Sequence, residues 1–259
     1  TSAGGEFLKP IAGMFAFSLA FAIPFTLFAF FPGWMKSLPK SGGWLNTVKV
    51  MLGFIELALA FKFLSIADQA FHWGILDREI NIAIWIVIGL LMGLYLLKFF
   101  RLPGDTGKDA EDPRVSVPRM ALAIGVLTFV MYLVPGMWGA PLKSLAGYLP
   151  PMYTHDFAPR HASDGGILCE TPKYADFLHL PHGLKGYFDY KQAVRCAREQ
   201  NKPVFIDFTG HGCTNCREME AVVWSDLRVL ERLRNDYVIV ALYVDDKTEL
   251  PEGDWYTSE

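Results

Sequence analysis

The segment Val204-Phe-Ile-Asp-Phe-Thr-Gly-His-Gly-Cys-Thr-Asn-Cys216 decides the fold of the second half of this chain. Its first residues, Val204 to Phe208, are apolar or aromatic apart from one aspartate, and this pattern predicts a strand. A glycine-containing turn then leads to Cys213 and Cys216, and a polar run that favours helix follows. This order places two thiols at the start of a helix, where backbone amides favour a thiolate.

The neighbouring sequence predicts further elements around this segment. Apolar residues within 190–197 recur with helical spacing, which predicts a short amphipathic helix. We expect a helix from Cys213 to about residue 223 and another over 226–234. The apolar run 237–244 is typical of a strand inside a parallel sheet. A strand, a helix and a second strand, with Cys-x-x-Cys where the first strand ends, indicate an α/β thioredoxin-like domain.

The predicted domain covers residues 185–259 and contains only about two strands, which is few for independent stability. We therefore expect it to be the N-terminal half of a thioredoxin-like fold. The chain begins with Thr1 and ends at Glu259. We interpret it as truncated at both ends.

The first half of the chain has a different character. Hydrophobic residues make up 52% of the sequence, and the excess lies almost entirely before residue 145. The long apolar stretches there are each able to cross about 30 Å of hydrocarbon as a helix. We predict an α-helical membrane bundle over 1–144, followed by a linker over 145–184 that is rich in proline and glycine. The four predicted spans are about 11–34, 48–66, 80–98 and 119–138.

Basic residues in the loops predict the orientation of these spans. The first and third loops carry most of the Lys and Arg of the membrane half, whereas the second carries only Arg78. Since basic loops stay in the cytoplasm, both chain ends and the Cys213/Cys216 segment should lie outside. In a bacterium this side of the inner membrane is the periplasm. The expected partner of the helices is the lipid bilayer, and a net charge of -3 gives no reason to expect nucleic acid.

The two thiols of the Cys-x-x-Cys suit thiol–disulfide exchange. We expect Cys213 to be the attacking thiol and Cys216 the resolving thiol that releases a mixed disulfide. No cofactor other than this pair is required. The alternative is a membrane-tethered copper or zinc module, but zinc needs a second pair of ligands. His211 is too close in sequence to supply one easily, and we predict no metal at the thiols.

Two acidic residues are candidates for tuning the thiols. Asp207 interrupts an apolar strand, which is costly without a purpose. We interpret it as a proton acceptor or donor for Cys216, with its pKa raised by burial. The alternative is an aspartate that faces water. Glu220 follows one turn after Cys216 and either raises the pKa of Cys213 or is simply solvated. His211 is either a further tuning group or an exposed loop residue.

The remaining candidates lie outside this motif. Cys169 and Cys196 either form a structural disulfide or remain free thiols. Glu56 falls within the second predicted span, where a charged residue suggests a functional role in a polar pathway. The pattern Gly89-x-x-x-Gly93 in the third span suggests close helix packing.

With these motifs in view, the chain resembles the DsbD family of transmembrane thiol:disulfide interchange proteins, which are protein-disulfide reductases. Three stretches carry the resemblance: Phe205 to Glu220, Val223-Trp-Ser-Asp226, and the membrane segment from Phe31 to Trp44. The resemblance covers essentially the whole chain. It implies that the four spans are the last four of an eight-helix membrane domain, and that Cys213 and Cys216 are the redox pair of the C-terminal periplasmic domain.

The resemblance also implies partners and a direction of electron flow. Electrons would pass from cytoplasmic thioredoxin through a membrane cysteine pair to Cys216 and Cys213. They would then reach the N-terminal periplasmic domain of the same protein and, from there, periplasmic thiol–disulfide proteins. Asp207 and Glu220 fall where the family has acidic residues beside the thiols.

The chain departs from the family pattern at two places. No cysteine precedes Cys169, so the membrane pair is missing and this sequence alone should not carry electrons across the bilayer. Gly212 stands where many relatives have an aromatic residue. A related membrane reductase that serves cytochrome c maturation or a peroxide pathway is a further alternative.

Overall fold

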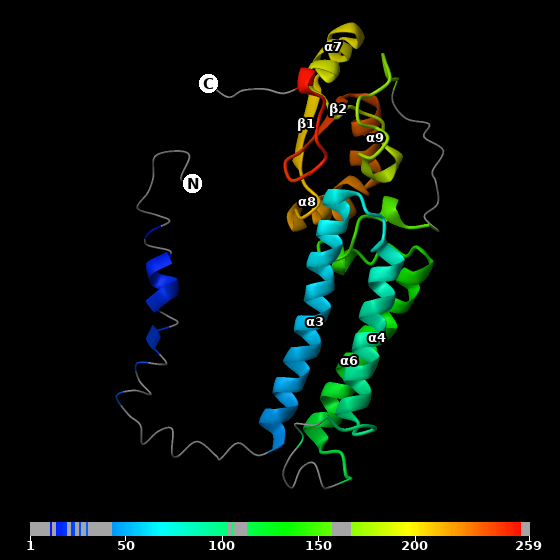
Figure 1. Cartoon of the computed structure of the whole chain (residues 1–259). Coiled ribbons are helices and arrows are strands. Elements are labelled where there is room, and N and C mark those ends of the chain that lie inside the picture. Colours follow the sequence, from blue (N-terminus) through cyan, green and yellow to red (C-terminus); the bar gives the residue numbers. More distant parts are fainter. Residues whose placement is uncertain are drawn as a thin grey trace. The chain divides into compact units, whose positions relative to one another are not determined.

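The structure of the chain is a computed structural model, drawn in Figure 1. It falls into two units, residues 1–50 with 101–114 and residues 51–100 with 115–259, which we describe separately. The first predicted span, 11–34, lies mostly outside the described residues, although its described positions are helical. The structure describes residues 11, 14–19, 22, 23, 26, 30, 43–102, 105, 113–156 and 167–254.

Within the described residues, three helices are long and apolar enough to cross a membrane: Leu45–Phe71, Arg78–Leu96 and Val117–Trp138. They correspond to α3 (Gly43–Phe71), to α4 (Arg78–Leu96), and to α6 (Val117–Leu133) with its extension η2 (Val134–Trp138). The membrane-helix prediction is therefore confirmed for the last three of the four spans. The start of α3 belongs to the first unit, where the Asn46 side chain donates a hydrogen bond to Asp105 at 2.5 Å.

Small residues bring α4 and α6 close together. A Cβ atom placed on Gly89 would lie only 2.6 Å from Cγ2 of Val130, and one on Gly93 only 2.7 Å from Cδ2 of Leu127. Both glycines are buried. The side chains of α6 therefore occupy the space that a side chain at either glycine would need, which is the arrangement expected from the small-x-x-x-small pattern.

Replacing Gly89 by alanine should destabilise the helix pair. Val130 is β-branched and stiff at χ1 within a helix, so its methyl group cannot easily move aside. We expect Gly89→Ala to lower the free energy of unfolding by about 1–3 kcal/mol. Thermal unfolding in detergent would measure the change. Gly125→Ala on α6 is the matched control, since nothing lies within 4 Å of a Cβ there. Equal melting temperatures for the two variants would contradict the packing argument.

The segment that follows α6 folds back onto the helix ends. Arg78, the one basic residue of the second loop, is buried and donates hydrogen bonds to the carbonyl oxygens of Pro141, at 2.9 Å, and Pro150. His155 also contacts the carbonyl oxygen of Gly136, at 3.0 Å. Residues 145–156, expected as the start of a linker, thus pack onto the membrane half. They include the short helix η4 (Met152–Thr154) and directly follow the short helix η3 (Lys143–Leu145).

The thioredoxin-like region centres on two parallel strands, β1 (Val204–Thr209) and β2 (Val238–Tyr243), with Asp207 opposite Ala241. Tyr187 adds an isolated parallel bridge to Val240. Figure 1 shows the two strands side by side, with α8 following the end of β1. The other elements of the region are η5 (Pro181–Gly183), α7 (Tyr190–Gln200), α8 (Thr214–Met219), the π-helical turn η6 (Glu220–Trp224), α9 (Leu227–Asn235) and η7 (Glu252–Asp254).

Apolar clusters cover both faces of the strand pair. On one face Val238 and Val240 pack with Ala193 and Ala197 of α7. On the other face Ile239 packs with a cluster that includes Trp224 of η6 and Leu233 of α9. This alternation follows from the two-residue period of a strand. The result is a small layered domain that holds the β1–α8 turn in place.

Candidate redox site at the start of helix α8

The two cysteines of the sequence motif form the start of α8. Cys213 is the N-cap residue, and its sulfur accepts a hydrogen bond from the backbone N–H of Cys216 at 3.2 Å. The two sulfurs are joined in a disulfide, and both residues are half-buried. The Cys216 sulfur also lies 3.8 Å from the carbonyl oxygen of Phe208. This is the geometry of a redox pair, because the N-cap position stabilises a thiolate on Cys213 after reduction.

An aspartate that follows β2 fixes the turn before the thiols. The carboxylate of Asp245 accepts hydrogen bonds from the backbone N–H groups of His211 and Gly212, each at 2.8 Å. A Cβ on Gly210 would lie 2.8 Å from the same carboxylate, so only glycine fits there without displacing it. Sequence reasoning did not select Asp245, because its role depends on the strand pairing.

The turn also lies against the end of membrane helix α3. A Cβ on Gly212 would meet Cγ2 of Ile66 at 3.4 Å, and one on Gly147 would meet Cγ2 of Thr214 at 2.5 Å. The backbone N–H of Lys247 donates to the carbonyl oxygen of Ala70 at 3.0 Å. The distance at Gly212 is an ordinary van der Waals contact, so the exposed backbone of Gly212 touches the end of α3 without crowding.

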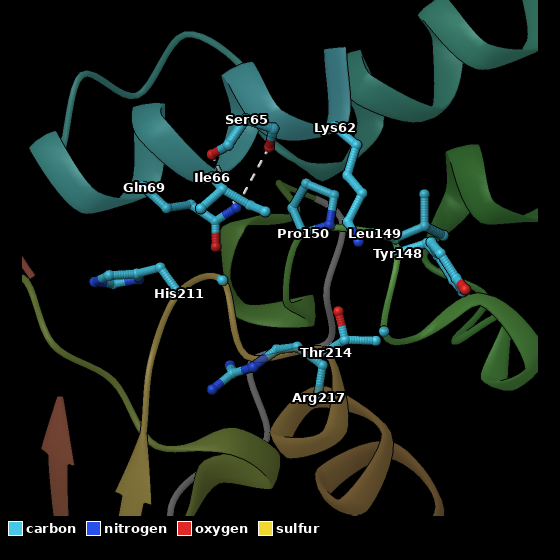
Figure 2. Close-up of a pocket in the computed structure, with 12 residues that line it drawn as sticks. Lys62, Ser65, Ile66, Gln69, Tyr148, Leu149, Pro150, His211, Thr214 and Arg217 are labelled. Carbon is cyan, nitrogen blue, oxygen red and sulfur yellow. Dashed lines mark hydrogen bonds between the residues drawn. The ribbon is translucent and has the colours of Figure 1, made fainter. Parts of the chain in front are cut away.

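Figure 2 shows the small cavity at this contact. Residues of α3, among them Lys62, Ser65 and Gln69, line one side of it. Thr214 and Arg217 of α8 line the opposite side. The start of the dithiol helix and the end of a membrane helix therefore line the same small cavity.

Beneath the dithiol lies a buried ion pair. Arg217 donates to a carboxylate oxygen of Glu220 at 2.8 Å, and the two side chains are only 6% and 8% exposed. Arg217 also donates to the hydroxyl oxygen of Thr209 at 2.8 Å. Sequence reasoning missed Arg217, although its position three residues before Glu220 in a predicted helix was a signal. Glu220 is therefore buried, and the interpretation of a solvated glutamate is wrong.

The two predicted acidic residues, Asp207 and Glu220, both interact electrostatically with Arg217. Burial raises the pKa of Glu220 to about 7, because it outweighs the attraction of Arg217 and is reinforced by repulsion from Asp207. Burial also raises the pKa of the half-buried Asp207, and the charge of Arg217 partly offsets this. Glu220 can therefore hold or release a proton near neutral pH, and Asp207, whose pKa is also raised, lies near the same cation.

Two tyrosines, which the sequence did not mark, extend this network. Tyr243, at the end of β2, donates a hydrogen bond to the carbonyl oxygen of His179 at 3.0 Å. Its hydroxyl and that of Tyr153 of η4 also interact electrostatically with Arg217 and Glu220. Burial raises the pKa of both phenols, so both stay neutral near pH 7.

Glu220 should make stability depend on pH. The carboxyl group of Glu220 holds its proton more tightly in the folded protein than in the unfolded chain. Its protonation therefore stabilises the fold fully below about pH 4.5, and this stabilisation is lost as the pH rises through about 7. In the unsubstituted protein the free energy of unfolding should decrease as the pH rises over this range. We expect Glu220→Gln to reduce the slope of this decrease by up to ~1.4 kcal/mol per pH unit. Melting curves at a series of pH values would measure it, with the exposed Glu231→Gln as control. An unchanged pH slope in Glu220→Gln would contradict the raised pKa.

The other sequence candidates lie outside this network. Cys169 and Cys196 are joined in a disulfide that ties the segment before the domain to α7. Glu56 lies on an exposed face of α3, ten residues before Ile66, which corresponds to about 15 Å along the helix. His211 is buried rather than exposed, and its Nε2 lies 2.9 Å from the Asp246 carboxylate.

A half-buried disulfide at a helix start, beside parallel strands, is the arrangement of a thioredoxin-like region, and here it lies next to apolar helices long enough to cross a membrane. A thioredoxin-like family model matches residues 185–254. The chain is 26% identical over 230 residues to the thiol:disulfide interchange protein DsbD of Pseudoalteromonas atlantica, covering 89% of this chain and 32% of that protein. It is 26% identical over 235 residues to the DsbD of Ralstonia nicotianae, covering 89% and 33%.

A third relative, the DsbD of Campylobacter jejuni, is 20% identical over 244 residues, covering 93% of this chain and 35% of that protein. The chain thus spans about a third of the length of the curated relatives it matches. No solved structure matches the chain. The matches confirm the resemblance to the DsbD family, with a thioredoxin-like domain in the C-terminal part. Together with the dithiol, they support thiol–disulfide exchange as the general chemistry of this site.

Proposed function

We propose that this chain is part of a membrane-bound protein-disulfide reductase that relays electrons from the cytoplasm to disulfide partners in the periplasm. The observation that carries the proposal is the Cys213–Cys216 disulfide at the start of α8, beside the end of membrane helix α3. In this position the dithiol can exchange electrons with groups at the membrane surface and also with soluble partners. The redox-active cysteine pair is the only redox group that the proposal requires.

The proposed location is the bacterial inner membrane, with the dithiol on the periplasmic side. The second loop lies at the dithiol end of the helices, since His72 contacts Asp246. Arg78 is the only arginine or lysine close to that loop, whereas the segment between α4 and α6 carries four, Lys98, Arg101, Lys108 and Arg114. This difference in the number of Lys and Arg residues supports a cytoplasmic position for the segment between α4 and α6.

The reaction would proceed in two exchanges. A donor dithiol attacks the Cys213–Cys216 disulfide, becomes oxidised to a disulfide, and leaves both cysteines reduced with two electrons and two protons. The Cys213 thiolate then attacks a partner disulfide and forms a mixed disulfide, while one partner sulfur leaves as a thiolate. The Cys216 thiolate attacks the Cys213 sulfur, which releases the partner as a dithiol and restores the disulfide.

Asp207 and Glu220 would manage the protons of this cycle. The second exchange requires Cys216 to lose its proton, and a carboxylate with a pKa near 7 can accept it at neutral pH. Arg217 holds Glu220 in place through the buried ion pair.

The partners follow from the resemblance. We propose cytoplasmic thioredoxin as the electron source, acting through membrane cysteines outside this sequence. The N-terminal periplasmic domain of the same protein would receive the electrons and pass them to periplasmic thiol–disulfide proteins. The chain itself has no cysteine before Cys169, so α3, α4 and α6 serve as a platform for the dithiol in this proposal.

A trapped intermediate would test the proposed exchange. We expect Cys216→Ser to accumulate a mixed disulfide with a partner, because no resolving thiol remains, whereas Cys213→Ser should form none. Non-reducing electrophoresis with a disulfide-bonded substrate protein measures the trapped species. Cys169→Ser with Cys196→Ser is the control that removes two cysteines without touching the dithiol. The absence of a trapped species in Cys216→Ser, or an equal amount in Cys213→Ser, would rule out the assigned roles.

Asp207→Asn tests proton transfer separately. The change removes one proton acceptor and the charge that helps to raise the pKa of Glu220. We expect the rate of substrate reduction at pH 7 to fall by about 10-fold or more, and the inflection of the pH–rate profile to move to lower pH. Stopped-flow measurements of the reduced protein would show both effects. Asp236→Asn, at an exposed position, should change neither. The relay role is wrong if Asp207→Asn keeps the rate and the profile of the unsubstituted protein.

A further inference from the structure

Three side chains that the proposed redox cycle does not use converge at the edge of the strand pair. They are His72 after the end of α3, His211 in the turn before the dithiol, and Asp246 after β2. One atom of each lies within 4.8 Å of an atom of both others. The Nε2 atoms of the two histidines each lie 2.9 Å from the same oxygen, Oδ2 of Asp246.

We propose that His72, His211 and Asp246 form a binding site for a divalent transition-metal ion of the zinc type. Two imidazole nitrogens and one carboxylate oxygen suit zinc, copper or nickel rather than magnesium or calcium, which prefer oxygen ligands. Three protein ligands also leave a fourth position open for water or another group. The site uses none of the cysteines, so it differs from the metal module that the Cys-x-x-Cys alone suggests.

The two nitrogen-to-oxygen distances suit such an ion, and the ligand atoms of the two histidines lie within 4.8 Å of each other. Zinc bonds to nitrogen and oxygen are about 2.0–2.1 Å long, so tetrahedral ligands lie about 3.3 Å apart. The two nitrogen-to-oxygen distances of 2.9 Å therefore need to widen only slightly. The side chains of His211 and Asp246 are 2% and 13% exposed, whereas that of His72 is 27% exposed. An ion could thus enter from the His72 side.

The backbone around the ligands already holds them in place. Asp246 uses its second oxygen, Oδ1, to accept the backbone N–H of Thr248 at 2.8 Å. The His211 backbone N–H is held by Asp245, and the neighbouring Lys247 N–H is bonded to the carbonyl oxygen of Ala70. Such outer contacts orient metal ligands and are typical of built metal sites.

His211 would hold the ion through Nε2, the nitrogen that already lies 2.9 Å from Asp246. Its Nδ1 has no hydrogen-bond partner among the described residues and would carry the proton of the neutral imidazole. The bound ion would tie the end of a membrane helix to the turn that carries Cys213, because His72 and His211 belong to these two elements.

Zinc titration of the full chain in detergent would test this site. The dithiol is kept as a disulfide, so that its sulfurs cannot act as thiolate ligands. Calorimetry with Zn²⁺ alone should show one ion bound per chain. We expect His72→Ala and Asp246→Asn each to weaken zinc binding more than about 10-fold. Loss of a residue that only contacts a metal ligand already lowers metal affinity by about 10- to 100-fold. Asp246→Asn preserves the shape of the side chain and its hydrogen-bonding oxygen.

His179→Ala is the matched control. Burial lowers the pKa of His179, and the nearby charge of His72 lowers it further, so the two histidines are close. His179 is nevertheless not one of the three ligands. This variant should bind zinc as the unsubstituted chain does. Melting curves without metal would show that each variant is folded. Absence of stoichiometric binding, or equal affinity in folded His72→Ala and Asp246→Asn, would overturn the proposal, as would a loss confined to His179→Ala. These outcomes are independent of the mixed-disulfide test of the redox function.

Discussion

The parallel pairing of β1 with β2 is the constraint on which the rest of the site depends. It brings the carboxyl ends of both strands to one edge, with the dithiol turn after β1 and Asp245 and Asp246 after β2. The pairing thereby places the Asp245 carboxylate where it accepts the backbone N–H groups of His211 and Gly212. The edge of a parallel sheet is a general place for function, because loops of different origin meet there.

The buried Arg217–Glu220 pair connects this edge to proton chemistry. A buried ion pair is weak evidence for stability, because desolvation offsets the attraction between the charges. Its consequence here is a glutamate whose pKa is raised to about 7. The π-helical turn that begins at Glu220 interrupts the α-helix directly after the dithiol segment, and such turns are frequent at functional sites.

The membrane half contributes more than an anchor. Glycines on α4 allow α6 to approach closely, and buried Arg78 fastens the returning segment to the helix ends. That segment and the end of α3 then form the surface against which the dithiol turn lies. The apolar side chains that α3 exposes, such as Leu52, Ile55 and Phe63, suit a lipid surrounding.

Patterns within short stretches of the sequence made much of the fold and of the site predictable. The apolar runs indicated membrane helices, and the alternation of strand and helix around the Cys-x-x-Cys indicated a thioredoxin-like region. Asp207 and Glu220 were predictable as candidates because a carboxyl group in an apolar strand, or one turn from a thiol, is conspicuous in a sequence. Asp245 and Tyr153 were not, since an aspartate after a strand and a tyrosine in a proline-rich segment are ordinary on their own.

The sequence by itself determined the elements and the chemical identity of the site. Helical and strand periodicities act over a few residues, and the two thiols lie three residues apart in the chain. Only the tertiary structure decided the surroundings of the thiols. Contacts such as His72 with Asp246, or Tyr153 with Tyr243, join residues far apart in sequence, and burial of a charge such as Arg217 depends on packing from several elements. No local pattern encodes either of these.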